Sequence, residues 1–347
     1  MSVGYFLKIK AYRFFNTRTG KKILQLLAPF ISVKALGNGK GKKPFIVCIT
    51  IDTESGYVEK NDYRVWQKNE PEAYIGFYKG IENWRNILKK YNAKSTFFLS
   101  TNCFGATGKY YDLILNQLKF VIKENHEIGL HLHPDSDLAI QKSLNKKFSA
   151  TSAKFYDEKE IGLLLKTGKN IIKENIGINP VSFRWGNWAL DTTSVKILQK
   201  NGFKIDSSAT PGIKWHQNNH MYYDWSKISL HYPWNLSTKD YQDTKNQDSK
   251  ILEIPIATFN FFGLTLRADP ANSVLLQLCF DYYYRNADRS KKPFIFVIIS
   301  HSIEAIHNDG TKTKVIDSMG EFLSHASKLK DVKFLTLQEA YKKYKSS

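Results

Sequence analysis

The sequence predicts an α/β fold in which parallel strands close into a barrel. From residue 45 onward, short apolar runs alternate with amphipathic helical patterns, and most of the linkers between them are short. The expected strands lie near residues 45–51, 95–99, 127–133, 181–185, 203–206, 251–256, 294–300 and 333–336. The expected helices lie near residues 75–91, 109–124, 157–175, 191–201, 272–286 and 315–329. In such barrels the catalytic side chains lie at the carboxyl ends of the strands.

Two of the expected strands end in pairs of metal-binding side chains. One apolar run leads into Asp52 and Glu54, and another ends in His131 and His133. Side chains two residues apart lie on the same face of a strand, so each pair projects together. Two carboxylates beside two imidazoles predict a divalent metal with a general base next to it. This combination indicates hydrolysis.

Length and composition predict a folded chain with a large core. The 347 residues are 42% hydrophobic and 14% aromatic, which is far from the composition of disordered chains. The three cysteines, Cys48, Cys103 and Cys279, are widely spaced in apolar sequence. We expect them to be reduced core thiols, and this favours a cytoplasmic location over a secreted disulfide framework.

The N-terminal segment carries much of the positive charge. Residues 1–45 contain ten Lys or Arg and no Asp or Glu, so they contribute +10 to the net charge of +19. Aromatic and aliphatic residues are interleaved with these cations. We expect a basic amphipathic helical leader, which either lies on an anionic membrane surface at the inner face of the membrane or packs on the barrel wall. The apolar stretch 23–36 is too short to span a bilayer, and a signal anchor is a less favoured alternative.

A glycine-rich connector marks the boundary between two predicted regions. Residues 37–44 contain three glycines and a proline, so we place the leader at 1–44 and the barrel at 45–347. The barrel region is only mildly basic and has no nucleic-acid motif, and nucleic acid is therefore not expected as a partner. Asp157 followed by Glu160 predicts a capping box at the start of a helix.

The stretch 207–250 is the long exception to the short linkers. It has no strand–helix pattern and is rich in aromatic residues, among them Trp215 and Tyr223. Long loops in compact domains are often functional, and aromatic faces suit sugar rings. We expect this loop to form a wall of a substrate site, with a packed lid that makes no sugar contact as the alternative.

In their order along the chain, the motifs resemble those of the polysaccharide deacetylase family (NodB homology, carbohydrate esterase 4), especially its divergent branch with an Asp-x-Glu first motif. The matching segments are Ile51–Glu54, Thr96–Phe98, His126–His131, Phe183–Asn187, Ile205–Ser208 and Ile298–His301. The resemblance covers about residues 45–340. It implies a distorted (β/α)7 barrel that removes N- or O-acyl groups from sugars with a divalent metal.

The resemblance also implies a role for each motif residue. By position, Asp52 would be the general base, and Glu54 and His131 would be metal ligands. Arg184 would orient Asp52 and balance its charge. An unpaired Arg in an apolar strand is costly, so a carboxylate partner is expected in any case.

The last two motifs imply the proton donor. His301 would be the general acid, supported by Asp206. His301 follows an apolar run, and an imidazole can protonate a leaving nitrogen near neutral pH. The alternative is that both residues have structural roles, with His301 as a hydrogen-bonded histidine at a strand end and Asp206 as a turn-forming acid.

One departure from the family pattern concerns the third metal ligand. The family has a second histidine four residues after the first, and that position here is Asp135. We favour His133 as third ligand because it shares a strand face with His131; the alternative is Asp135 with His133 behind it. The residues expected to contact substrate are Asp135, Trp185, Trp215 and Tyr223. We expect the metal to be Zn²⁺, with Co²⁺, Mn²⁺ or Ni²⁺ as alternatives.

These observations predict a metal-dependent carbohydrate deacylase. The expected reaction is de-N-acetylation of an amino sugar in a cell-surface glycan or a lipid-linked precursor, so the expected partner is a glycan or glycolipid. A deformylase, or a metal-free glycoside hydrolase with paired carboxylates, is an alternative enzyme. An alternative of another class is a membrane-associated glycan-binding protein on an inactive barrel.

Overall fold

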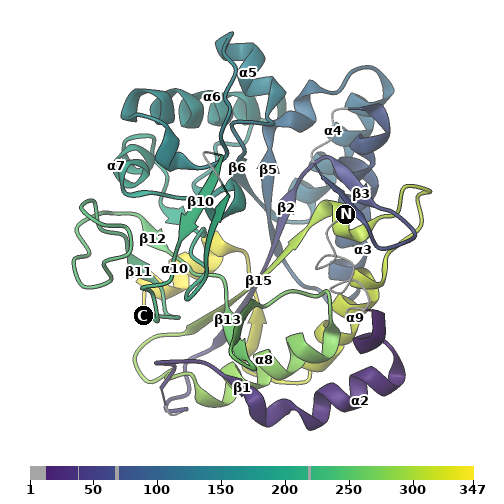
Figure 1. The fold of residues 1–347 in the computed structure, drawn as a ribbon, viewed down its shortest axis with the longest axis vertical. Helices are drawn as coiled ribbons and strands as arrows, with labels where there is room; N and C mark the ends of the chain where they lie inside the picture. The colour runs from purple at the N-terminus through teal and green to yellow at the C-terminus, as the bar shows by residue number, and fades with distance from the viewer. Residues whose placement is uncertain (1–12, 38, 67–69, 218–219) are drawn as a thin grey trace.

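A curled sheet of nine strands lies at the centre of the molecule in the computed structural model, which describes residues 13–37, 39–66, 70–217 and 220–347 (Figure 1). From one edge, the strands are β11 (Trp234–Asn235), β12 (Leu252–Glu253), β8 (Ile205–Asp206), β7 (Ser182–Trp185), β6 (Glu127–Leu132), β5 (Ser95–Ser100), β2 (Phe45–Thr53) and β15 (Phe294–His301). The short β16 (Val332–Phe334) pairs with the start of β2. All pairs in this sheet are parallel except β11 with β12.

The sheet curls until its two sides meet. Just beyond β12, Ile256 forms an isolated parallel bridge with Val297 of β15, and the Ala257 N–H donates to the Val297 carbonyl over 3.0 Å. On this side the contact is a single bridge, whereas β2 and β15 pair along eight residues. The prediction of a distorted α/β barrel is therefore confirmed.

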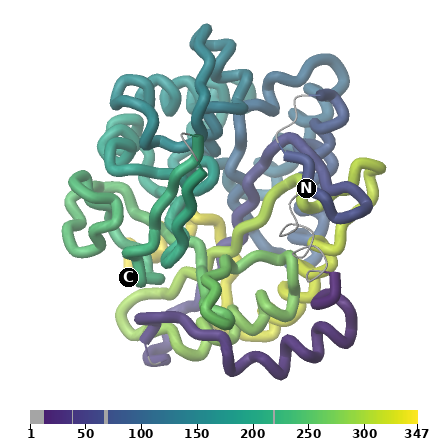
Figure 2. Tube along the Cα trace, viewed as in Figure 1, coloured from purple at the N-terminus to yellow at the C-terminus, as the bar shows by residue number. Residues whose placement is uncertain are grey.

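Helices cover the outside of the curled sheet (Figures 1 and 2). They are α2 (Arg18–Leu26), α3 (Ile81–Lys90), α4 (Lys109–Lys123), α5 (Leu138–Leu144), α6 (Glu158–Ile176), α7 (Thr192–Lys200), α8 (Ser273–Asn286), α9 (Lys314–Ala326) and α10 (Leu337–Lys345). The capping box predicted from Asp157 and Glu160 is confirmed at the start of α6. The sequence pattern did not predict the short helices α5 and α10.

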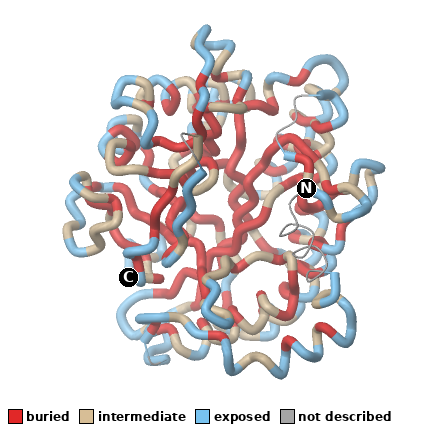
Figure 3. The backbone as a smooth tube through the Cα atoms, in the orientation of Figure 1, coloured by how far each residue is buried: buried red, intermediate tan, exposed pale blue. Residues whose placement is uncertain are grey.

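The core follows the central strands, which are red in Figure 3. All nine residues of β2 are buried, because a parallel strand in the middle of such a sheet is covered on both faces. The three free cysteines are also buried, as expected. The polar exceptions in this core are concentrated at the carboxyl ends of the strands.

Three hairpins lie outside the barrel. They are β3 (Gly56–Val58) with β4 (Arg64–Trp66), β9 (Lys214–Gln217) with β10 (Met221–Asp224), and β13 (Thr258–Phe261) with β14 (Leu264–Arg267). The stretch 207–250 is thus not a simple loop, because it contains β9, β10 and β11. Its strands β9 and β10 are short and lack the continuous apolar runs of the barrel strands, which hid the hairpin from the sequence pattern.

The described part of the leader packs on the barrel. Leu24 of α2 is fully buried, and Lys21 forms an ion pair with Glu321 of α9 at 2.7 Å. After α2, β1 (Ile31–Ser32) pairs with β13. The cations at positions 8 and 10 lie outside the described residues. None of the helices that the structure describes is both long and apolar enough to cross a bilayer.

Candidate active site

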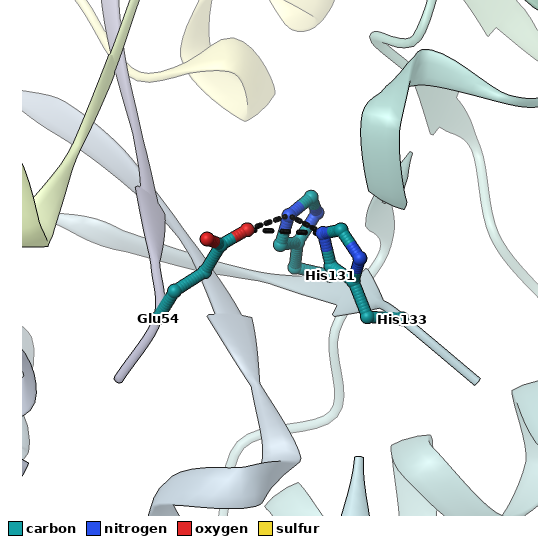
Figure 4. Close-up of side chains that lie close together, drawn as sticks. All are labelled: Glu54, His131 and His133. Atoms are coloured by element: carbon teal, nitrogen blue, oxygen red, sulfur yellow. Dashed lines mark hydrogen bonds and ion pairs between the residues drawn. The ribbon is translucent and has the colours of Figure 1, made fainter. Parts of the chain in front are cut away.

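Three side chains from two strand ends converge on one point (Figure 4). Glu54 follows β2, His131 belongs to β6, and His133 follows β6 by one residue. Glu54 Oε1 lies 3.1 Å from His131 Nε2 and 3.0 Å from His133 Nε2, and the two ring nitrogens are 3.1 Å apart. All three residues are buried. We call them the metal triad, since their donor atoms are close enough to share one ion.

The hydrogen bonds of the triad fit a bound cation. His131 Nδ1 lies 3.1 Å from the Arg184 carbonyl, and donation there leaves a lone pair on Nε2. That lone pair faces a second imidazole nitrogen and a carboxylate oxygen. These three electron-rich atoms would repel one another unless a cation or a proton lies between them. The buried His133 Nδ1 has no hydrogen-bond partner among the described residues. Two imidazole nitrogens and one carboxylate oxygen are a ligand set typical of catalytic zinc.

The electrostatics of the triad favour an ionised carboxylate. Burial alone would raise the pKa of Glu54, but His133 and the close contacts with both imidazoles hold that pKa well below its usual range. Conversely, the charge of Glu54 raises the pKa of His133 against the effect of burial. Glu54 is therefore in the state that a metal ligand requires.

Gly186 makes room for the ring of His133. A Cβ at this position would lie 2.6 Å from His133 Cγ, the atom nearest the backbone in that ring. The ring cannot move aside without leaving the triad. This close approach explains a glycine directly after the strand that carries Arg184.

A buried ion pair lies beside the triad. Arg184 donates to Asp52 Oδ1 over 2.7 Å and to the Ser207 carbonyl over 2.7 Å, and its guanidinium lies over the Phe98 ring. The predicted pairing of Arg184 with Asp52 is thus present. Arg184 binds Oδ1, so it is the other carboxylate oxygen of Asp52 that faces the histidines. Asp52 Oδ2 lies 3.7 Å from His131 Nε2 and 3.9 Å from His301 Nε2.

His301 at the end of β15 is held by Glu304 rather than by Asp206. Glu304 Oε2 accepts from the His301 backbone N–H over 3.1 Å and lies 3.3 Å from His301 Nδ1. Arg64 of β4 contacts the other oxygen of Glu304 at 2.9 Å. Burial would lower the pKa of His301, but Glu304, and after it Glu54 and Asp52, raise this pKa to about 9. His301 is therefore positively charged near neutral pH.

The predicted support of His301 by Asp206 was wrong. Asp206 accepts from the Ser208 backbone N–H and hydroxyl, both over 3.0 Å, and its acidic neighbour is Glu253. Burial and the neighbouring Asp206 raise the pKa of Glu253 well above its usual range, so Glu253 can hold a proton against Asp206. Asp206 thus belongs to a buried hydrogen-bond network on β8, the strand next to β7, which carries Arg184. Glu304 was missed because its contact depends on the tight 3-10 turn Ser302–Ala305 that follows β15.

Asp135 does not join the triad. Its Oδ2 faces His220 at 3.5 Å, and its Oδ1 is buried without a partner among the described residues. His133 occupies the third position instead, as the shared strand face of His131 and His133 led us to favour.

The triad opens into a cavity of ≈290 Å³ at the carboxyl ends of the strands. Its lining residues are Asp52, Glu54, Arg64, Trp66, His131, His133, Asn187, Trp188, Arg267, Asp269, Ile299, His301 and Glu304. Burial raises the pKa of Asp269 to about 6, with a further contribution from Glu304. Trp66 meets the His301 ring edge-on at 4.8 Å.

The aromatic residues predicted to contact substrate do not line this cavity. Trp185 is fully buried and donates to the Thr151 carbonyl, so its assignment to substrate was wrong. Tyr223 is buried behind Trp188, whose ring it meets at 5.9 Å, and Trp215 is exposed on β9. Trp188 and Trp66 take their place at the cavity wall. Trp188 stands three residues after Trp185, one residue beyond the Phe183–Asn187 motif, and the turn after β7 places it at the cavity.

One family and several solved structures are similar to this chain. The sequence pattern described as "Polysaccharide deacetylase" matches residues 71–205. No curated protein matches the chain in sequence. A protein from Mycobacterium smegmatis assigned as a polysaccharide deacetylase is 16% identical with a TM-score of 0.58, and the match covers 91% of this chain and 95% of that one.

Two further solved structures are similar in fold. One from Pseudomonas aeruginosa PAO1, also assigned as a polysaccharide deacetylase, is 13% identical with a TM-score of 0.54, covering 87% of this chain and 91% of that one. A PuuE allantoinase is 12% identical with a TM-score of 0.55, covering 88% of this chain and 92% of that one. At these identities the structural likeness establishes the shared fold.

Proposed function

Because residues 71–205 match the polysaccharide deacetylase family and the fold is shared with proteins assigned to it, we propose that this chain removes the N-acetyl group from an amino sugar of a cell-surface glycan or its lipid-linked precursor. The observation that carries the proposal is the metal triad, with Asp52 and His301 beside it in one cavity. Its test is acetate release from N-acetylated amino-sugar glycans by the metal-loaded protein, with the metal-free protein as control.

The metal triad would hold the ion. Two imidazoles and a carboxylate suit Zn²⁺ best among the common divalent metals. When bound, such an ion polarises the acyl carbonyl and makes water a stronger nucleophile. The remaining steps of the reaction are proton transfers that the side chains of this cavity can perform.

Asp52 is placed to act as the base. Arg184 binds its Oδ1, so Oδ2 is the oxygen that can take a proton from the attacking water. Opposite it, the protonated His301 can give a proton to the departing nitrogen. One carboxylate and one imidazolium in reach of the same atoms thus supply the base and the acid.

Replacing Glu304 by Gln is expected to move the alkaline limb of the kcat/KM profile to lower pH. The negative charge of Glu304 raises the pKa of His301, so its removal lets the acid form disappear earlier as pH rises. We expect a shift of about one pH unit or more. The profile is measured beside Glu321→Gln, a control at a half-exposed acid that pairs with Lys21. An unchanged alkaline limb in Glu304→Gln would remove His301 from the role of acid.

We further propose that the leader side of the molecule contacts an anionic membrane surface. Four large apolar side chains are exposed there, and we call them the apolar tip: Leu26 (79% exposed), Phe30 (52%), Phe262 (54%) and Leu264 (66%). The rings of Phe30 and Phe262 stack at 4.5 Å, which joins the leader to the tip of the β13–β14 hairpin. The exposed cations of the same segment, such as Lys22 and Lys34, suit anionic headgroups.

The double change Phe262→Ser and Leu264→Ser is expected to weaken vesicle binding by about tenfold or more. The reason is that the protein loses the free energy gained when these two apolar side chains move from water into the lipid. Co-sedimentation with vesicles that contain phosphatidylglycerol measures it. The matched control is Leu138→Ser with Leu163→Ser, which are exposed on α5 and α6 at the opposite end of the view in Figure 1. Equal binding of wild type and the Phe262/Leu264 variant would argue against membrane contact through the apolar tip.

A further inference from the structure

The β13–β14 hairpin connects the apolar tip to the cavity. Leu264 begins β14 at the exposed end, and Arg267 ends β14 at the wall of the cavity. They are three positions apart along the strand, which corresponds to roughly 10 Å. Immediately after Arg267, Ala268 is tied to the barrel, since the Ile299 N–H donates to its carbonyl over 3.0 Å. The position of Arg267 relative to the reacting groups is therefore fixed by the barrel.

Arg267 offers the cavity a cation that no acid of the described residues pairs with. Its guanidinium carbon lies 3.9 Å from the centre of the Trp188 ring, and within the described residues no carboxylate forms an ion pair with it. Arg184 and Arg64, which also reach this region, are paired with Asp52 and Glu304. A planar guanidinium stacked on an indole is pre-organised for two parallel hydrogen bonds to a carboxylate or phosphate.

Trp188, the ring on which Arg267 stacks, stands on an uncommon backbone conformation. Its Nε1 is buried and has no hydrogen-bond partner among the described residues. The backbone that presents it is held in an uncommon conformation, with φ of +49° at Asn187 and +57° at Trp188. Such backbone strain occurs where function fixes a side chain. The guanidinium that this ring holds at the cavity wall is complementary to a ligand rich in acceptor oxygens.

We propose that Arg267, stacked on Trp188, binds the phosphate of a lipid-linked sugar phosphate. In such a substrate the phosphate stands between the sugar and the lipid. The groups of the protein follow the same order. The metal triad and Asp52 would face the sugar, Arg267 would face the phosphate, and the apolar tip would face the membrane that holds the lipid. This inference rests on the proposed deacetylase function and names its substrate class.

The first test compares three substrates with wild type and Arg267→Gln. The substrates are N-acetylglucosamine 1-phosphate, its polyprenyl-linked form in vesicles, and the neutral methyl glycoside. The preference in kcat/KM for the phosphate-bearing over the neutral substrate is expected to fall about 30-fold in Arg267→Gln, mainly through KM. Arg285→Gln is the matched control, because Arg285 is exposed on α8 and does not line the cavity. An equal loss on all three substrates would overturn phosphate recognition.

The second test separates the two sources of phosphate. The Phe262→Ser and Leu264→Ser variant is expected to lose activity on the polyprenyl-linked substrate and to keep the wild-type rate on soluble N-acetylglucosamine 1-phosphate. If wild type prefers the soluble sugar phosphate and this variant matches it on both, the substrate is not lipid-linked and that part of the proposal is wrong.

A binding measurement distinguishes failure of this inference from failure of the proposed function. Calorimetric titration of the full-length chain with N-acetylglucosamine 1-phosphate requires no turnover. If wild type releases no acetate but binds the sugar phosphate, and Arg267→Gln weakens binding while Arg285→Gln does not, the deacetylase function fails and phosphate recognition stands. Equal affinity in all three proteins would overturn phosphate recognition by Arg267 whatever the activity. Thermal unfolding of each variant verifies that it is folded.

Discussion

Replacing His133 by Ala is expected to abolish metal binding and to reduce acetate release to background. His133 Nε2 is 3.0 Å from Glu54 Oε1 and 3.1 Å from His131 Nε2, so its removal leaves two donors where a catalytic zinc uses three. Replacing Asp135 by Ala is expected to leave the metal in place, because its carboxylate faces His220 instead of the triad.

Elemental mass spectrometry on the purified proteins measures this difference directly. Wild type and Asp135→Ala should each carry about one divalent ion per chain, and His133→Ala should carry almost none. The opposite pattern, with metal retained in His133→Ala and lost in Asp135→Ala, would move the third ligand to Asp135. Circular dichroism of both variants controls for loss of fold.

Replacing Asp52 by Asn is expected to lower kcat by about 10²- to 10⁴-fold while the metal stays bound. Asn has nearly the same shape and can still accept a hydrogen bond from Arg184, but it cannot take a proton from water. Because Asp52 is not one of the triad residues, metal content separates a lost base from a lost ligand.

The matched control for this change is Asp309→Asn, at a surface acid that pairs with Lys60. Acetate release at saturating substrate gives kcat for both variants, and metal content is read on the same samples. Asp52→Asn with full metal and wild-type kcat would mean that another group is the base. Thermal unfolding reports how far the buried Arg184 depends on the charge of its partner.

The sequence predicted those parts of the site that lie on regular strands. Asp52 with Glu54, and His131 with His133, are two residues apart, and strand geometry alone places each pair on one face. The barrel then brings the ends of β2 and β6 together, although β5 lies between them in the sheet. The pairing of the strand residue Arg184 with a carboxylate was expected for another reason, the cost of burying an unpaired guanidinium.

The parts that the sequence did not predict depend on turns and hairpins. The contact of Glu304 with His301 requires the turn after β15, and Arg267 reaches the cavity only through the register of β13 with β14. Trp185 and Trp188 are aromatic residues three positions apart, yet only the second lines the cavity. The local pattern of residue types carries no information on such placements, because they are fixed by backbone conformation and by contacts between distant segments.

The most direct test of metal-dependent deacetylation is a zinc titration of the metal-free, full-length chain. Acetate released from an N-acetylglucosamine oligomer or a lipid-linked N-acetylglucosamine is followed at each addition. The account predicts no release without metal and a rise that saturates at about one zinc per chain. Zinc binding without acetate release from any N-acetylated substrate, or equal release by the metal-free protein, would contradict it.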